Sequence, residues 1–364
     1  MHSSIERRRS IDAGQEETMQ DRKLSRRMVL SGFAAGAASV SMVWGIGRAQ
    51  AQAAPAVLTN KKIRLRYGHS QPANHSTGQA ASRFVKLVSD RTNGAVTISL
   101  FPNNQLGTDR ELQMMIETDQ LDFTHSNSAT MGNFLPQIGV MDLPFIWRSP
   151  QHYFTVVDGP FHQEINKLLA AKTGHRYLNW WFDGTRNVYT GKRVVNELAD
   201  LRGLKIRAPE AKVFIDTFTA LGANPTPLPF PEIYTAIEAG VIDGFEGSNG
   251  IVDDSKLYEV AKHRAATGHI MVGFGMTTAG RRFDALPKDI REIIATAALE
   301  VQAFQRELQL GAEDTIVKRM ISERGVANTQ PDLAPFRQAV QPVHEAFHAT
   351  HHTQALRDLI LKAT

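Results

Sequence analysis

The stretch LRGLKIRAPEAKVFIDTFTALGANPTPLPFPEIYTAIEAGVIDGFEGSN, residues 201–249, decides the fold of this chain. Apolar residues alternate over 204–208 and the run closes at a proline, which predicts a strand with Arg207 at its carboxyl end. Residues 213–221 have the spacing of a helix, and a glycine follows. The stretch therefore begins as a strand and a helix.

The remainder of the stretch repeats this alternation. Four prolines hold residues 225–231 extended, residues 232–239 predict a second helix, and residues 241–245 predict another strand. Strands that alternate with helices indicate βα units and a parallel sheet. Ligands of such sheets lie beyond the carboxyl ends of the strands, where Arg207 and an expected loop at 245–249 are both placed.

The rest of the chain predicts further elements of both kinds. Strands are expected at 62–69, 96–101, 121–124, 177–182 and 269–277, with a short apolar run at 141–145 and a loop at 125–128. Helices are expected at 78–88, 111–118 and 153–172, and helical segments at 333–361 with a break near Pro342. A helical pattern over 287–325 is longer than a typical globular helix.

Several words of this sequence resemble one known family. GLKIRAPE, ALGANPTPLPF, EIYTAIEAGVIDG and KLYEVAKH follow one another in a single order, and LFPNNQLGTDRE and LDFT precede them. Together they resemble the solute-binding proteins of TRAP (tripartite ATP-independent periplasmic) transporters, and the resemblance extends back to Lys62. An ordered series of this kind is far more specific than any one short motif.

The resemblance implies an α/β fold and a binding function. The fold would be a two-lobed periplasmic-binding-protein fold, type II-like, with parallel or mixed sheets joined by hinge strands and one long helix spanning both lobes. By family layout, lobe 1 comprises 61–183 plus 273–312, and lobe 2 comprises 184–272 plus 313–364. The protein would capture an organic acid between the lobes in the periplasm and deliver it to a membrane permease, without a cofactor and without catalysis. A ligand-presenting sensor partner of a membrane receptor remains an alternative.

Composition limits the other functions. Of 364 residues, 42% are hydrophobic and 21% are charged, which is typical of a globular protein of two domains or lobes. The absence of cysteine excludes disulfides and thiolate chemistry. The net charge of +4 is concentrated at the N-terminus, since the chain beyond residue 51 has 33 basic and 32 acidic residues. No basic field is left to favour nucleic acid.

Residues 1–53 are interpreted as an export signal. Arg26 and Arg27 precede a weakly apolar run that ends near Gly47, and small-x-small cleavage sites follow at 49–53. The paired arginines and the Gly- and Ser-diluted run resemble a twin-arginine (Tat) signal. A transmembrane anchor is the alternative, disfavoured because the apolar run is short and rich in small residues.

Arg207 is the leading candidate for the ligand-binding site. A guanidinium presents two parallel donors that match a carboxylate. On residue type alone, an arginine after an apolar strand is as readily a solvated strand end. The resemblance implies that Arg207 is the carboxylate-binding arginine and that Arg186 is a second arginine of the site. A surface ion pair of Arg186 with Asp183 is the alternative.

The remaining candidates also come from the resemblance. It implies an aromatic wall at Phe230, a polar contact at Asn127 and contacts from the first loop. The predicted ligand-binding set is Arg207, Arg186, Phe230, Asn127, Asn74, His75, Phe182 and Glu246, with no metal. Because strand side chains alternate, Trp180 or Phe182 is expected to face the cleft and Trp181 to face away.

One word departs from the family pattern. Many relatives have DGQEN where this chain has DGFEG, so Gly247 replaces an asparagine that clamps the ligand. Phe245 could supply an aromatic wall, and Ser248 or Asn249 could substitute for the lost amide. The change indicates a ligand larger than a small diacid, such as a sugar acid, a keto acid or an aromatic acid.

A competing motif lies near the C-terminus. His344, Glu345 and His348 satisfy HExxH, which on a helix places two imidazoles on one face beside a general base, as in zinc hydrolases. No third ligand follows at the usual spacing. A solvated, histidine-rich helix face is therefore the preferred interpretation.

Overall fold

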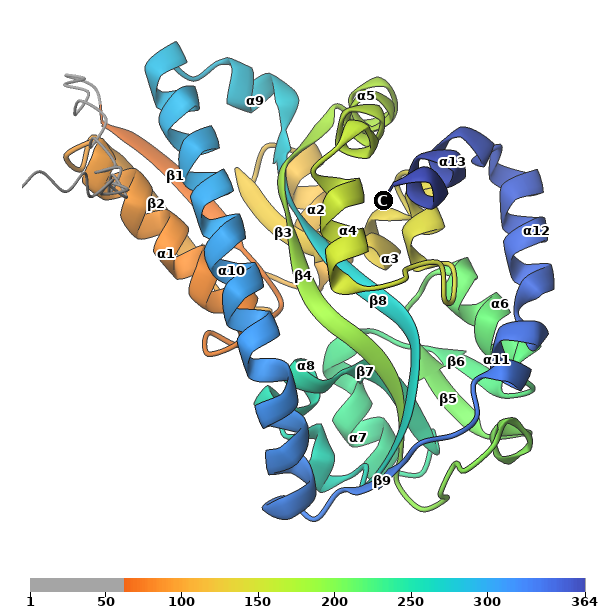
Figure 1. The fold of residues 1–364 in the computed structure, drawn as a ribbon. Coiled ribbons are helices and arrows are strands. Elements are labelled where there is room, and N and C mark those ends of the chain that lie inside the picture. The colour runs from red at the N-terminus through yellow and green to blue at the C-terminus, as the bar shows by residue number, and fades with distance from the viewer. Residues whose placement is uncertain (1–61, 364) are drawn as a thin grey trace, which may run out of the picture. The chain divides into compact units, whose positions relative to one another are not determined.

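The computed structural model describes residues 62–363, and its strands form one mixed sheet (Figure 1). The spatial order is β2-β1-β3-β8-β4-β7-β5-β6, with β9 beside β8. The strands are β1 (Ile63–Gly68), β2 (Val96–Phe101), β3 (Phe123–Asn127), β4 (His175–Thr190), β5 (Lys205–Ala208), β6 (Asn224–Pro227), β7 (Gly244–Ser248), β8 (His263–Ala279) and β9 (Ala327–Thr329).

Two long antiparallel strands, β4 and β8, join two sets of short parallel strands. The carboxyl end of β8 pairs with β3, which continues into β1 and β2. The carboxyl end of β4 pairs with β7, which continues into β5 and β6. We call β1–β3 with α1–α3 the first half, and β5–β7 with α6–α8 the second half.

The register of β4 against β8 shifts between Phe182 and Gly184, where the two sets of strands meet. Gly184 has φ +102°, a conformation that other residues rarely adopt. A glycine is therefore required where β4 passes from one half to the other.

The helices cover the sheet. They are α1 (Ser76–Arg91), α2 (Asp109–Glu117), α3 (Ser128–Met131), α4 (Pro150–Val157), α5 (Pro160–Thr173), α6 (Lys212–Ala220), α7 (Ile233–Glu238), α8 (Asn249–Asp254), α9 (Gly280–Asp284), α10 (Lys288–Ser322), α11 (Ala334–Ala339), α12 (Gln341–His351) and α13 (Gln354–Lys362). Short 3₁₀ turns are η1 (Pro136–Asp142), η2 (Leu198–Leu201), η3 (Phe230–Glu232) and η4 (Leu257–Glu259).

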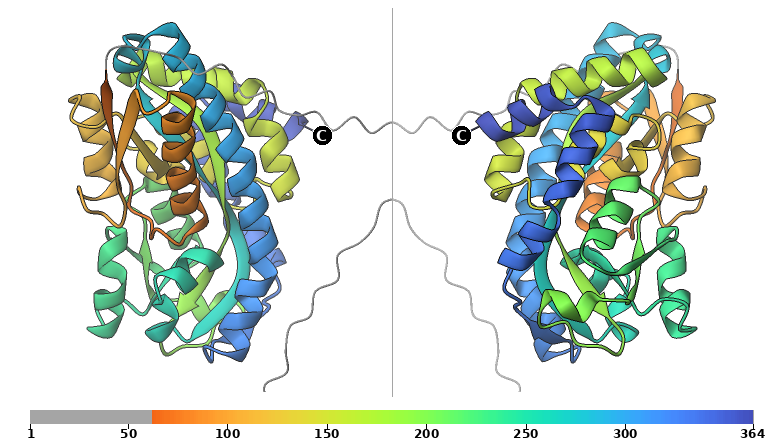
Figure 2. Two further views of the ribbon diagram at one scale, coloured as in Figure 1. Left: turned by 90° about the vertical axis from the view of Figure 1, so that its left-hand side faces the viewer. Right: turned by 90° about the vertical axis from the view of Figure 1, so that its right-hand side faces the viewer.

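The long helix α10 runs beside β4 and contacts both halves, through α1 and α8 (Figures 1 and 2). Glutamines at helical spacing bind the strand backbone. Gln302 Oε1 accepts from the amide of Trp180 at 2.9 Å, and Gln305 accepts from the amide of Phe182 at 2.9 Å and donates to its carbonyl at 2.7 Å. These bonds satisfy buried backbone groups where the ladder is irregular.

The predicted architecture is confirmed in its class and in most elements. The long helix, the strand that ends near Arg207, and the two helices of the opening stretch are all present. The proline-rich run forms β6, which tolerates prolines because it is the edge strand of the sheet.

Residues 153–172 are mostly helical, as expected, in two helices that Gly159 and Pro160 separate, and the apolar run at 141–145 begins in the last two residues of η1. Two local expectations are wrong. The expected loops at 125–128 and 245–249 are instead the ends of β3 and β7 running directly into α3 and α8. The polar residues at these positions belong to strand ends and helix caps, and their polar composition alone does not distinguish these from a loop.

The division into lobes 61–183 plus 273–312 and 184–272 plus 313–364 stays a prediction. Its boundaries fall at the irregularity of β4. The C-terminal helices contact both sides, because α12 packs on α6 and η1 while α13 packs on α5.

Candidate functional site

A cavity lies where strand ends of the two halves face each other. The first half contributes Ser70, Gln71, Thr108, Asp109 and Asn127, and the second contributes Arg207, Glu210, Phe230, Phe245, Glu246 and Gly247. Its free volume of about 80 Å³ suits a small, compact molecule and not a peptide. The position beyond the carboxyl ends of β1, β3 and β5 agrees with the rule for parallel strands.

Arg207 is a buried cation in this cavity. Its side chain is 5% exposed, and its Nε donates to the carbonyl of Leu228 at 2.8 Å. Among the described residues, no carboxylate lies within ion-pair distance of its guanidinium, and neither terminal nitrogen has a protein hydrogen-bond partner. Burial lowers the pKa of Arg207 from 12.5 to about 10. The cavity therefore contains a cation that lacks a close anion.

Arg186 is different, because Glu246 occupies its donors. Arg186 and Glu246 lie diagonally on neighbouring strands, and their side chains form a bidentate ion pair. His269 Nε2 lies 3.5 Å from the same carboxylate. Burial alone raises the pKa of Glu246, but the Arg186 charge and the hydrogen bonds from His269 and Arg186 lower it to about 2.

The predicted surface pair of Arg186 with Asp183 is thus replaced by a buried pair with Glu246. Both side chains are nearly inaccessible, and Arg186 also donates to the Glu246 carbonyl at 2.9 Å. The ion pair holds both groups at the cavity wall. It leaves Arg207 as the cation available to an anionic ligand.

Asn127 and Phe230, two residues of the predicted ligand-binding set, line the cavity. Asn127 ends β3 and caps α3, since its Oδ1 accepts from the amide of Thr130 at 2.8 Å. Its Nδ2 has no protein acceptor among the described residues and is free to donate. Phe230 begins η3 and packs against the core of the second half, so it is both a wall of the cavity and a core residue.

Three acidic residues of the cavity are missing from the predicted set, namely Asp109, Asp183 and Glu210. Asp109 lies at the start of α2, directly after the N-cap Thr108, and Glu210 follows β5. Asp109 Oδ1 is buried and has no hydrogen-bond partner among the described residues. Burial raises the pKa of Asp109 from 3.8 to about 6, although Ser70 and the charge of Arg207 oppose this effect. The direction of the Asp109 carboxyl depends on the tertiary structure and is not visible in the sequence.

The side chains around the DGFEG segment do not replace the missing amide. Gly247 and Phe245 both line the cavity, and Phe245 stacks on Tyr189 with ring centroids 5.3 Å apart. Ser248 donates to Asp183 at 2.7 Å, and Asn249 binds Tyr189, Arg264 and Glu313. Neither Ser248 nor Asn249 replaces the amide, because both are used elsewhere.

Three predicted residues lie outside the cavity lining. Phe182 is buried against Tyr153 and Phe154, so the expectation that Trp180 or Phe182 faces the cleft does not hold. The predicted alternation is present, but both faces of β4 are covered at this point. Asn74 and His75 lie at the start of α1, where they contact Asp254 and Asp183.

The HExxH residues are engaged in structural contacts. His344 Nε2 lies 2.8 Å from the carbonyl of Pro144, and His348 Nδ1 lies 2.8 Å from Thr353 Oγ1. Residues 62–363 contain no group of three His, Cys, Asp or Glu side chains placed to hold a metal ion. The geometry gives the zinc interpretation no support.

The predicted signal at 1–53 lies outside the described residues. Within residues 62–363, none of the helices combines the length and the apolar character that crossing a membrane requires.

Solved structures with known ligands share this fold. The sugar acid binding protein DctPAm from Advenella mimigardefordensis, in complex with galactonate, has a TM-score of 0.80 and 29% identity, and the match covers 84% of this chain and 99% of that one. A TRAP periplasmic solute-binding protein from Xanthobacter autotrophicus, with bound β-D-galacturonate, has a TM-score of 0.78 and 30% identity, covering 82% and 100%.

Sequence relatives agree. The 2,3-diketo-L-gulonate-binding periplasmic protein YiaO of Escherichia coli is 30% identical over 72% of this chain and 79% of its own length. The sialic acid-binding periplasmic protein SiaP of Vibrio cholerae is 29% identical over 80% and 90%. Residues 67–350 match the family described as bacterial extracellular solute-binding protein, family 7. The chain belongs to this family, and it is a solute-binding protein of the TRAP type.

Proposed function

We propose that the protein captures a sugar acid in the cavity around Arg207 and delivers it to the permease of a TRAP transporter. The observation that carries the proposal is the buried guanidinium of Arg207, which has no counter-ion close by and faces a cavity of small-molecule size. A ligand carboxylate supplies the missing anion through two parallel hydrogen bonds.

The other polar groups favour a hydroxylated monoacid. Glu246 already neutralises Arg186, and Arg110 at the cavity is exposed, so Arg207 is the buried cation that is free for one ligand carboxylate. Asp109 and Glu210 line the same space, and carboxylates accept hydrogen bonds from hydroxyl groups but repel a second ligand carboxylate. Gly247 leaves room that a side chain would fill. The galactonate and galacturonate complexes of similar proteins support this ligand class.

An aromatic acid fits less well. Phe230 and Phe245 provide apolar surface on the second half, but the opposite wall is formed by Ser70, Asp109 and Asn127. An aromatic ring would leave Asp109 Oδ1 and Asn127 Nδ2 without partners, which costs about 1–3 kcal/mol for each group. Hydroxyl groups satisfy them.

Binding involves no covalent step. The two predicted lobes close about the crossing at Asp183 and Gly184, which removes the ligand from water and completes contacts from both halves. The ligand favours the closed form only to the extent that it makes better contacts there. We also infer a periplasmic location after export directed by Arg26 and Arg27. Cell fractionation tests this, because replacing both by lysine should retain the precursor in the cytoplasm.

The test is a binding panel on the purified protein. D-Galacturonate, D-glucuronate and D-galactonate represent sugar acids, while succinate and benzoate are matched probes without the hydroxyl pattern. A probe at one hundred times its dissociation constant should stabilise the fold by about 2.7 kcal/mol in a thermal-shift assay. We expect stabilisation by at least one sugar acid and none by succinate or benzoate. Binding of succinate or benzoate in preference to all three sugar acids would overturn the proposed ligand class.

A further inference from the structure

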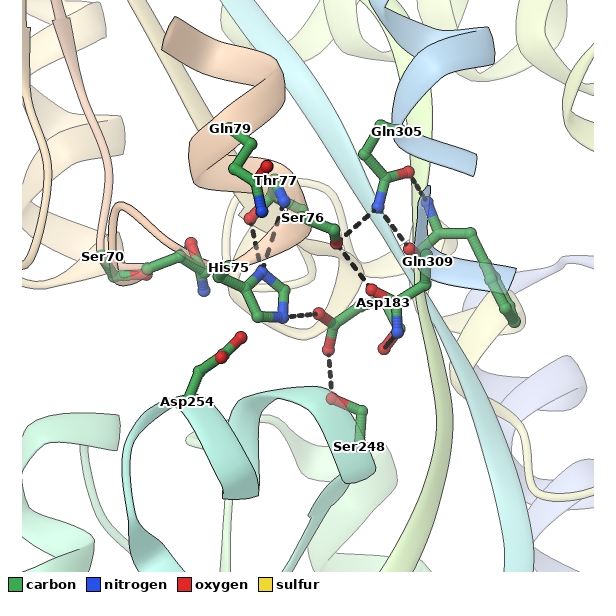
Figure 3. Close-up of polar contacts among 12 residues, drawn as sticks. Ser70, His75, Ser76, Thr77, Gln79, Asp183, Ser248, Asp254, Gln305 and Gln309 are labelled. Atoms are coloured by element: carbon green, nitrogen blue, oxygen red, sulfur yellow. Dashed lines mark hydrogen bonds and ion pairs between the residues drawn. The ribbon is translucent and has the colours of Figure 1, made fainter. Parts of the chain in front are cut away.

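A second cluster of polar residues adjoins the cavity through Asp183, where α1 meets the crossing of β4 (Figure 3). His75 is its centre. The imidazole is 1% exposed and caps α1: its Nδ1 lies 2.9 Å from Thr77 Oγ1. Its Nε2 lies 3.1 Å from Asp183 Oδ1. The first half thus holds a buried His–Asp pair at the point where the two halves join.

The second half contacts this pair through two hydrogen bonds. Ser248, the last residue of β7, donates to Asp183 Oδ2 at 2.7 Å. Asn74, beside His75, donates to Asp254 Oδ1 of α8 at 2.9 Å. A side chain placed on Gly250 of α8 would begin 3.5 Å from His75 Nε2, so α8 lies directly against the imidazole. Ser248 belongs to a strand paired with β4, whereas the Asn74–Asp254 bond joins the two halves directly.

The charges around His75 are mostly acidic. Burial lowers the pKa of His75, but the hydrogen bond and charge of Asp183 and the charge of Asp254 outweigh burial and raise it above 6.5. Five other titratable groups surround the His75–Asp183 pair. They are Asp254 on α8, His69 after β1, His125 on β3, Glu313 on α10 and Arg186 on β4, and the neutral Gln309 of α10 lies beside them. His69 and His125 are uncharged near neutral pH, because burial lowers the pKa of each.

We propose that His75 and Asp183 form a positioning latch that draws Ser248 and Asp254 of the second half onto the first, so that protonation of His75 favours closure. His75 does not line the cavity but Asp183 does, so the latch acts through the hinge at the edge of the ligand site. The inference rests on the proposed function in one respect, which is that closure of the halves encloses the ligand.

The direction of the pH effect follows from linkage. The latch requires Asp254 to approach His75 on closure, and the closed form then binds the imidazole proton more tightly than the open form does. Closure is therefore favoured at pH values below the ordinary pKa of histidine, and this advantage is lost as pH rises through the raised pKa. Each difference of one unit in the pKa of His75 between the two forms changes the closed-to-open ratio by about tenfold.

Distance measurement on the ligand-free protein tests the latch. The chain has no cysteine, so spin labels can be placed specifically with Met114→Cys in the first half and Val241→Cys in the second, both of which are exposed positions. Pulsed electron spin resonance then gives the populations of short and long distances at pH 5.5 and 8.5. We expect the closed-to-open ratio to fall about threefold to tenfold from pH 5.5 to pH 8.5.

Three variants separate the latch from other titrating groups. Asp254→Asn keeps the acceptor for Asn74 but removes the charge, and His75→Gln keeps a donor toward Asp183 but cannot titrate. Both should reduce the pH effect to less than about twofold. Asp314→Asn, a matched change at an exposed position of α10, should retain it. Circular dichroism confirms that each variant is folded.

A wild-type ratio that does not change with pH, or the same pH effect in Asp254→Asn as in wild type, would overturn the latch. Because the distances are measured without ligand, that result leaves sugar-acid binding untouched. Failure of the sugar-acid panel, in turn, leaves the pH-dependent distances measurable. The two proposals can therefore fail separately.

Discussion

Replacing Arg207 by alanine gives the sharpest test of the binding site. The guanidinium is 5% exposed and has one hydrogen bond to the protein, from Nε to the carbonyl of Leu228. The lowering of its pKa from 12.5 to about 10 corresponds to roughly 3 kcal/mol by which the empty cavity disfavours the charge. A bound carboxylate removes this penalty and gains two charge-assisted hydrogen bonds.

These quantities bound the binding free energy that Arg207→Ala should lose. Arg207→Ala leaves the carboxylate of a bound ligand desolvated and without a partner, which costs about 2–5 kcal/mol of binding. The dissociation constant should rise by about thirtyfold to a few thousandfold. Stability of the ligand-free protein should change by less than about 1 kcal/mol, because removing an unpaired buried charge offsets the lost packing.

Isothermal titration calorimetry with the sugar acid selected by the binding panel measures the effect. Arg207→Lys should also bind poorly, since an ammonium group cannot form the bidentate contact. Arg202→Ala, at an exposed position just before the same strand, is the matched control for charge and should bind as wild type does. The carboxylate assignment is refuted if Arg207→Ala binds within twofold of wild type.

Three further predictions concern the residues around Arg207. Arg186→Ala should destabilise the protein by about 3–5 kcal/mol in urea unfolding at pH 7, because it strands the buried Glu246; a loss below about 1 kcal/mol would contradict the ion pair described here. Burial raises the pKa of Asp142 from 3.8 to about 7, so the folded state binds more protons than the unfolded state between these values and stability should fall as pH rises from 4 to 7. Asp142→Asn should remove that slope and be more stable than wild type at pH 8 by a few kcal/mol. If its unfolding curves at pH 5 and pH 8 match those of wild type, Asp142 is not the source of the pH dependence. Gly247→Asn places its first side-chain atom 3.3 Å from Phe245, so the Phe245 ring must shift slightly, and its amide would occupy the cavity and weaken sugar-acid binding by about fivefold to a hundredfold. Calorimetry showing unchanged affinity would place the ligand away from Gly247.

The position of Arg207 could be predicted because it depends on local sequence. An apolar strand closed by a proline places its last side chains at the carboxyl edge, and β5 ends at Ala208 as expected. Asn127 and Phe230 were predicted from the family resemblance, and they lie at the end of β3 and shortly after β6. The cap at Asn127 also fixes its orientation.

Other site residues could not be resolved from the sequence. Whether Arg186 was free or paired depended on the diagonal register of β4 and β7, which brings Glu246 beside it. Phe182 was misjudged because alternation gives two faces of a strand but not what covers them, and here helices and strands cover both. His75 was expected near a ligand and instead joins Asp183, more than one hundred residues away.

The sequence by itself determined the class of fold, the βα alternation, the long helix and the strand-end location of Arg207. Those features arise from short-range periodicity, caps and proline placement, which act within about twenty residues. Only the tertiary structure decided which charges are neutralised and which remain available. That outcome depends on strand register and on contacts across the hinge. Glu246 forms an ion pair with Arg186, and Asp183 contacts His75. Arg207 faces the cavity without a close counter-ion.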